Sequence, residues 1–109
     1  MANKSSLGEF EHHVLLVALR LGDEAYTASI LLELEQRTGR EVSAAAVYIA
    51  LRRLEKSGLL RTRLKTAVER DERRERRYVR VTPAGVRMLT EARRRFDRLW
   101  EGIELLSEG

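Results

Sequence analysis

The chain has 109 residues, of which 43% are hydrophobic, and a formal net charge of +4. This size and composition fit one folded domain and exclude a disordered tail. No apolar run approaches the roughly 20 residues of a membrane span, and the polar start Met1–Ser6 is unlike a signal peptide, so we expect a cytoplasmic protein without a membrane partner. The absence of cysteine excludes disulfides and thiolate metal sites.

The positive charge is concentrated in one segment of the chain. Arg61–Arg80 contains nine basic and four acidic residues, a net +5 that leaves −1 for the remainder. A localised basic segment is typical of an element that binds a polyanion such as nucleic acid.

Three helices are expected in the first half of the chain. The first spans about Gly8–Leu21. The second starts at Thr27, whose hydroxyl is expected to cap it, and stops at Gly39. Ser43 is expected to cap the third, which runs to about Ser57 and has a narrow apolar stripe.

A hairpin follows the third helix. Apolar or hydroxyl-bearing residues over Leu60–Val68 alternate with Arg61, Arg63, Lys65 and Ala67, which predicts a strand, and Arg76–Val81 predicts the return strand. The charged stretch Glu69–Glu75 between them has no glycine, and we expect it to form a long polar tip.

The last helix is predicted to begin at Thr82-Pro83, where proline occupies the first turn. Its apolar residues follow a heptad spacing, which predicts a dimerisation seam. A helix of about 24 residues would be about 36 Å long, more than one small domain can cover. The seam consists of Leu89, Ala92, Phe96, Leu99, Ile103 and Leu106, with Trp100 one step away.

The order of these elements predicts a fold that is mainly α with a β-hairpin. Two helices joined by a short turn, followed by a hairpin, form a winged helix-turn-helix, in which the helix after the turn enters the DNA major groove. We expect a DNA-binding domain over residues 1–82 and a long C-terminal dimerisation helix over residues 83–109.

Several separated motifs resemble those of the PadR-like family of transcription regulators. Ser43–Tyr48, Leu51–Glu55 and Gly58-Leu59 resemble its recognition-helix signature, and Arg77–Gly85 its strand-to-helix junction. The resemblance covers roughly residues 7–106 and implies a homodimeric, usually repressing regulator of the short subclass with a single C-terminal helix. The chain departs from the family pattern in two places. Its wing tip has no glycine, and position 27 is threonine where the family often has glycine.

The resemblance and the helical geometry together indicate the candidates for DNA contact. Tyr48 would donate its hydroxyl to a phosphate, and Arg52 would reach a phosphate or a guanine edge. Thr27 would lie beside a phosphate at a helix start. The full set is Thr27, Ser43, Ala45, Tyr48, Arg52, Arg53 and Lys56 on the helices and Arg73, Arg74, Arg76 and Arg77 on the wing.

Each of these residues also has a purely structural interpretation. Tyr48 would be an aromatic residue at the boundary of the core, and Arg52 would form an ion pair with Glu55 or Glu35. The wing arginines would form a solvated face of the hairpin, and Thr27 would only cap its helix. The alternative function is a winged-helix module that binds protein and not DNA.

Phe96 and Trp100 are candidates for the wall of a ligand pocket between subunits; the alternative is packing in an interface. The family resemblance implies a small aromatic molecule as the effector. No cofactor is expected. Glu9, His12 and His13 do not have convincing metal-ligand spacing, and no nucleophile–base pair indicates an enzyme.

Overall fold

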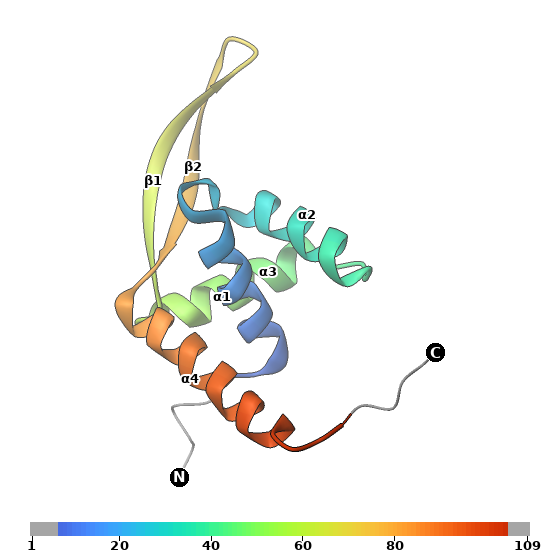
Figure 1. Cartoon of the computed structure of the whole chain (residues 1–109). Helices are drawn as coiled ribbons and strands as arrows, with labels where there is room; N and C mark the ends of the chain where they lie inside the picture. The colour runs from blue at the N-terminus through green and yellow to red at the C-terminus, as the bar shows by residue number, and fades with distance from the viewer. Residues whose placement is uncertain (1–6, 105–109) are drawn as a thin grey trace.

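A computed structural model describes residues 7–104 and confirms a mainly helical fold with one β-hairpin (Figure 1). Figure 1 shows α1 between α2 and α4, with the hairpin projecting away from the helices. The elements are α1 (Glu9–Leu21), the short 3₁₀ turn η1 (Gly22–Glu24), α2 (Thr27–Thr38), α3 (Ala44–Lys56), β1 (Leu60–Glu69), β2 (Glu72–Val81) and α4 (Pro83–Trp100).

The ends of α2 and α3 are defined by local hydrogen bonds. Gly39 ends α2 in the left-handed region, with φ of 71°, and the Ser43 hydroxyl accepts the backbone N–H of Ala46 at 3.0 Å, as expected. The expected cap at Thr27 is wrong: Thr27 is the first helical residue. The hydroxyl of Ser29 instead accepts the N–H of Tyr26 at 3.0 Å. The helix start therefore lies one residue earlier than a threonine cap would put it.

The helices and the base of the hairpin share one hydrophobic core. The predicted stripe on α3 is buried, and it meets apolar side chains from both strands and from α4. Burial of this kind stabilises the fold by about 25 cal/mol for each Å² of apolar surface removed from water. The fully buried large side chains are Val14, Leu15, Ile30, Val47 and Leu54.

The expected long tip of the hairpin is wrong. The strands pair as far as Glu69 and Glu72, so the turn contains only Arg70 and Asp71. Their φ angles are 51° and 67°, which is the geometry of a two-residue type I′ turn. This turn matches the right-handed twist of the strands, so pairing continues through residues whose charges predicted a loop. The result is a projecting hairpin of two ten-residue strands.

The last helix is shorter than the heptad spacing predicted. α4 ends at Trp100 after 18 residues, a length of about 27 Å, and Ile103 lies beyond its end. Gly102 adopts a left-handed φ of 79°, and the N–H of Ile103 donates to the carbonyl of Trp100 at 2.9 Å, so the chain turns there. Leu106 lies outside the described residues. No helix within residues 7–104 is long and apolar enough to span a bilayer.

The base of the hairpin is closed by Thr82, directly after β2. Its N–H donates to the carbonyl of Leu59 at 3.0 Å, and its hydroxyl donates to the carbonyl of Gly58 at 2.7 Å. The same hydroxyl accepts the N–H of Gly85 at 3.1 Å and so caps α4. These bonds join the end of α3, both strands and the start of α4 at one point.

Gly85 permits this junction because it has no side chain. A Cβ there would lie 2.5 Å from the carbonyl oxygen of Leu59 and 2.7 Å from Cγ1 of Val81. We expect Gly85→Ala to lower the free energy of unfolding, because overpacking of about 1–3 kcal/mol exceeds the helix preference of alanine, about 1 kcal/mol. Urea unfolding measures the difference.

Gly8→Ala is the control, since a Cβ at Gly8 meets no atom within 4 Å and the cap preference there is worth under about 1 kcal/mol. Equal stability of Gly85→Ala and the wild type would contradict the close approach.

Candidate nucleic-acid interface

The solvent-facing side of α3 carries the residues expected to contact DNA. Ala45, Tyr48, Arg52 and Lys56 are exposed, while Val47, Ala50, Leu51 and Leu54 on the opposite side are buried. Ser43 is exposed at the helix start, where its hydroxyl is already used in capping. The small side chains of Ala44 and Ala45 allow another surface to approach the backbone of this first turn.

Tyr48 and Arg52 form a pair on this exposed side. A guanidinium nitrogen of Arg52 donates to the Tyr48 hydroxyl at 2.9 Å, and the guanidinium carbon lies 5.7 Å from the ring centroid. The hydroxyl therefore accepts from Arg52 and keeps its own proton free to donate. The arrangement directs two hydrogen-bond donors outward, and Arg52 forms no ion pair with any described acid.

The other helical candidates lie in different surroundings. Arg53 approaches Glu11 of α1 at 3.5 Å and joins Arg52, Glu55 and Lys56 around a shallow hollow. Thr27 is half-buried in the first turn of α2. Thus α3 brings Tyr48 and Arg52 together, whereas Arg53 also contacts the first helix.

The register of the hairpin separates the four wing arginines onto two faces. Arg73 and Arg77 lie opposite Val68 and Leu64, whereas Arg74 and Arg76 lie opposite Ala67 and Lys65. Successive residues of a strand point to opposite sides, so the four cannot all face one partner. We name the side with Arg73 and Arg77 the core-side face because its base is buried in the core; it carries Leu60, Thr62, Leu64, Thr66, Val68, Arg73, Glu75, Arg77, Val79 and Val81.

The other side, which we name the clamp face, holds the hairpin against η1 and the start of α2. Asp23 of η1 pairs with Arg80 and lies 3.9 Å from Arg63. The hydrogen bond and charge of Arg80 lower the pKa of Asp23 below its usual value. This ion-pair cluster escaped the sequence analysis because its members are far apart in the chain.

Aromatic contacts extend the clamp face toward the tip. The rings of Tyr26 and Tyr78 meet edge to face with centroids 5.3 Å apart, and the guanidinium of Arg76 lies 4.5 Å from the Tyr26 centroid. Arg76 also pairs with Glu69 at 2.7 Å, and Tyr78 and Glu69 raise the pKa of Arg76 above its usual range. Ala25 completes the attachment, because its carbonyl accepts the N–H of Val79 at 2.9 Å.

The predicted dimerisation residues divide between the core and the surface. Leu89 is only 6% exposed and packs in the core of its own chain, and Ala92 is half-buried. Leu99, by contrast, is 72% exposed. The other exposed apolar side chains of this region are Phe96, Trp100 and Ile103.

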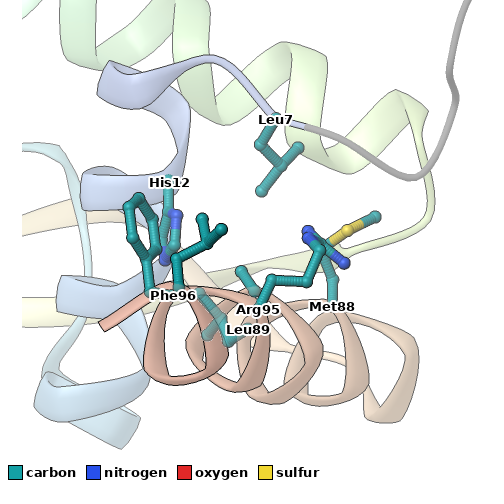
Figure 2. A pocket seen from close by; sticks show the side chains of 8 residues that line it. Leu7, His12, Met88, Leu89, Arg95 and Phe96 are labelled. Carbon is teal, nitrogen blue, oxygen red and sulfur yellow. The ribbon is translucent and has the colours of Figure 1, made fainter. Parts of the chain in front are cut away.

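A hollow of about 210 Å³ lies between α1 and α4 (Figure 2). Phe96 lines it together with His12 and Arg95, but Trp100 does not. Burial lowers the pKa of His12 below 6.5, and the positive charges of His13 and Arg95 lower it further. The remaining lining residues are Leu7, Met88, Leu89, Ala92 and Leu99.

The PadR-like family of transcriptional regulators matches the chain over residues 15–91. The chain belongs to this family. A PadR-family regulator from Eggerthella lenta DSM 2243 is 31% identical, with a TM-score of 0.64, 82% of this chain covered and 75% of that one. No curated protein matches.

Two more distant structures share the fold of this PadR-like chain. A PadR-like transcription factor from Bacteroides fragilis has 23% identity, a TM-score of 0.68 and 84% of each chain covered. PadR of Bacillus subtilis in complex with operator DNA has 16% identity and a TM-score of 0.64, with 95% of this chain and 53% of that one covered.

The matched segment of this PadR-like regulator includes α3 and the wing but ends within α4. Phe96, Leu99 and Trp100 follow the last matched residue, position 91. The exposed apolar end of α4 therefore lies outside the matched segment. No group of acidic or histidine side chains within residues 7–104 could hold a metal ion.

The lowered pKa of His12 predicts a pH dependence of stability. Because the unfolded chain binds this proton more readily than the folded one, the free energy of unfolding should fall as the pH falls through 6.5, and level off below the folded pKa. His12→Gln should reduce this fall, measured by urea unfolding at fixed protein concentration.

His13→Gln is the comparison, because His13 contributes to the lowered pKa of His12. It should make the fall smaller without removing it. An identical pH profile for His12→Gln and the wild type would show that burial of this imidazole has no energetic consequence.

Proposed function

We propose that this PadR-like regulator is a cytoplasmic transcriptional repressor that binds a pseudo-palindromic DNA operator as a homodimer. The observation that carries the proposal is the exposed side of α3, where the Tyr48–Arg52 pair directs hydrogen-bond donors outward beside a basic wing. A helix of this kind, preceded by a tight turn, fits the major groove. The Bacillus subtilis relative, solved with operator DNA, supports the same use of the fold.

Homodimerisation rests on the exposed apolar end of α4. Phe96, Leu99 and Trp100 are each more than half exposed in one copy of the chain. A contiguous apolar patch on a single chain is typical of an interface, and a two-fold axis is the commonest way for identical patches to cover each other. In this arrangement the partner's α4 would cover the hollow between α1 and α4.

Replacing Phe96 and Leu99 together by aspartate should convert the dimer into monomers, because two charges would be buried in the interface. Analytical ultracentrifugation at micromolar concentration measures the mass. Thr90→Asp places a single aspartate at an exposed polar position of α4 and should leave the dimer intact. A monomeric wild type would contradict the proposal.

Two copies of α3 related by a two-fold axis would read inverted half-sites about one helical turn apart. Selection from a random-sequence library should therefore recover a pseudo-palindrome. Arg52→Ala should weaken the selected site by about 1–3 kcal/mol at the base pair that it contacts and weaken random DNA less.

Arg53→Ala is the matched control, since we expect Arg53 to reach only the DNA backbone. It should weaken selected and random duplexes to a similar extent. Recovery of no sequence, together with wild-type binding no stronger than that of an unrelated protein, would favour the alternative of a protein-interaction module that has lost DNA binding.

The hollow between α1 and α4 is our candidate site for a small aromatic effector. Phe96, Leu89 and Met88 offer apolar walls, and Arg95 supplies a positive charge at the rim. In a dimer the nearby Trp100 of either copy would be available to complete the site. Binding there would act on DNA affinity by changing the distance between the two copies of α3.

A further inference from the structure

The two faces of the wing differ in what their charged side chains contact. On the clamp face, Arg63 and Arg80 share Asp23, Arg76 contacts Glu69 and Tyr26, and Arg74 lies 3.7 Å from Glu72. Lys65, in addition, lies 5.4 Å from the centroid of the Tyr78 ring. The clamp face has more positive charge than the core-side face, but much of it is neutralised within the chain.

The core-side face has the opposite character. Leu64 is 58% exposed and Val68 is 66% exposed, although an apolar residue in a strand normally packs against a neighbour. Arg77 lies directly across from Leu64, and Arg73 directly across from Val68. Neither arginine forms an ion pair with another described residue.

This face continues the side of the sheet that packs against α3. At its base Leu60 and Val79 are buried in the same core as Val47 and Leu51 of α3. Because alternate residues keep to one side of a strand, Leu64 and Val68 project on the side of the sheet that α3 occupies. A duplex seated on α3 would therefore meet the core-side face before the clamp face.

We propose that the wing contacts the DNA minor groove with its core-side face, using Arg73 and Arg77 as cations and Leu64 and Val68 as apolar contacts. The inference rests on the proposed function and assigns it to one side of the wing. Arginine is attracted to the negative potential of a narrow minor groove, and apolar side chains pack there against sugars and base edges. Arg76 on the clamp face is a positioning residue, because its contact with Tyr26 holds the hairpin against the start of α2, whereas Arg74 contacts only Glu72 within the wing.

Glu75 is the one acid on the core-side face. It lies between Arg73 and Arg77 along β2 and directly across from Thr66. A carboxylate at this place opposes the approach of phosphates and restrains non-specific binding. Glu75→Gln should therefore strengthen binding to random DNA.

Two charge-matched double variants test the assignment: Arg73→Gln with Arg77→Gln, and Arg74→Gln with Arg76→Gln. Each removes two positive charges from β2, so long-range electrostatics change equally. Titration of the full chain with a random-sequence duplex across a salt series gives the salt slope, which is the change in the logarithm of the binding constant with the logarithm of the salt concentration. The first variant should lose about 2 units of this slope per subunit, about 1 for each arginine. The second should retain a slope close to that of the wild type and lower the stability of the hairpin, measured by amide hydrogen exchange.

A second readout uses duplexes in which inosine replaces guanine on either side of the half-sites. This change removes the 2-amino group from the minor groove and leaves the major-groove edge unaltered. It should tighten binding by the wild type and by the Arg74/Arg76 variant, and should leave the Arg73/Arg77 variant unaffected.

Equal losses of salt slope in the two double variants would overturn the assignment to one face, while leaving DNA binding itself established. A third variant combines Leu64→Ser with Val68→Ser. If its oligomeric state changed while its DNA affinity did not, this result would also overturn the assignment and indicate a protein partner for this face. Failure of the proposed function would be recognised separately, because the wild type would then bind no duplex.

Discussion

The close approach of Gly85 to the carbonyl of Leu59 is the constraint on which the arrangement of the functional elements depends. Thr82 fixes this approach with hydrogen bonds to Leu59, Gly58 and Gly85. These bonds tie the end of α3, the base of the wing and the start of α4 to one another. The surface proposed to contact DNA and the helix proposed to join two copies are therefore connected through a few backbone groups.

The wing is attached to this unit on one side by the core and on the other by the clamp face. Hydrophobic burial of Leu60 and Val79 orients its base, where Asp23 also pairs with Arg80, and the contact of Tyr26 with Arg76 restrains its middle. Exposed ion pairs contribute little to global stability, since each is worth about 0–1 kcal/mol. Their value here is geometric, because several weak contacts along one face limit the angles that a long hairpin can adopt.

The two surfaces proposed for function have different physical characters. The exposed side of α3 is polar and small-sided near its start, which suits contact with a hydrated, charged groove. The exposed end of α4 is apolar, which suits contact with an identical surface. Because Thr82 joins these elements, a ligand that alters the packing of α4 has a short structural route to α3.

Local sequence patterns determined the helices, their order and the buried stripe on α3, because a period of 3.6 and the caps at Gly39 and Ser43 act over a few residues. They also indicated Tyr48 and Arg52 of this helix as candidates for DNA contact. The cap of α2, the length of the hairpin and the end of α4 were predicted wrongly, since each depends on a competing local geometry: Ser29 instead of Thr27, left-handed Arg70 and Asp71, and left-handed Gly102.

Only the tertiary structure decided which wing arginines share a side and what they contact. From the sequence alone, Arg73, Arg74, Arg76 and Arg77 were equivalent candidates for DNA contact. Pairing with β1 places Arg73 and Arg77 on one face of the hairpin and Arg74 and Arg76 on the other. Asp23 and Tyr26 contact clamp-face residues that lie between 40 positions away, for Asp23 and Arg63, and 57 positions away, for Asp23 and Arg80. Leu89 likewise fits the heptad spacing yet packs in its own core, because periodicity shows that a side chain will be buried but not against which surface.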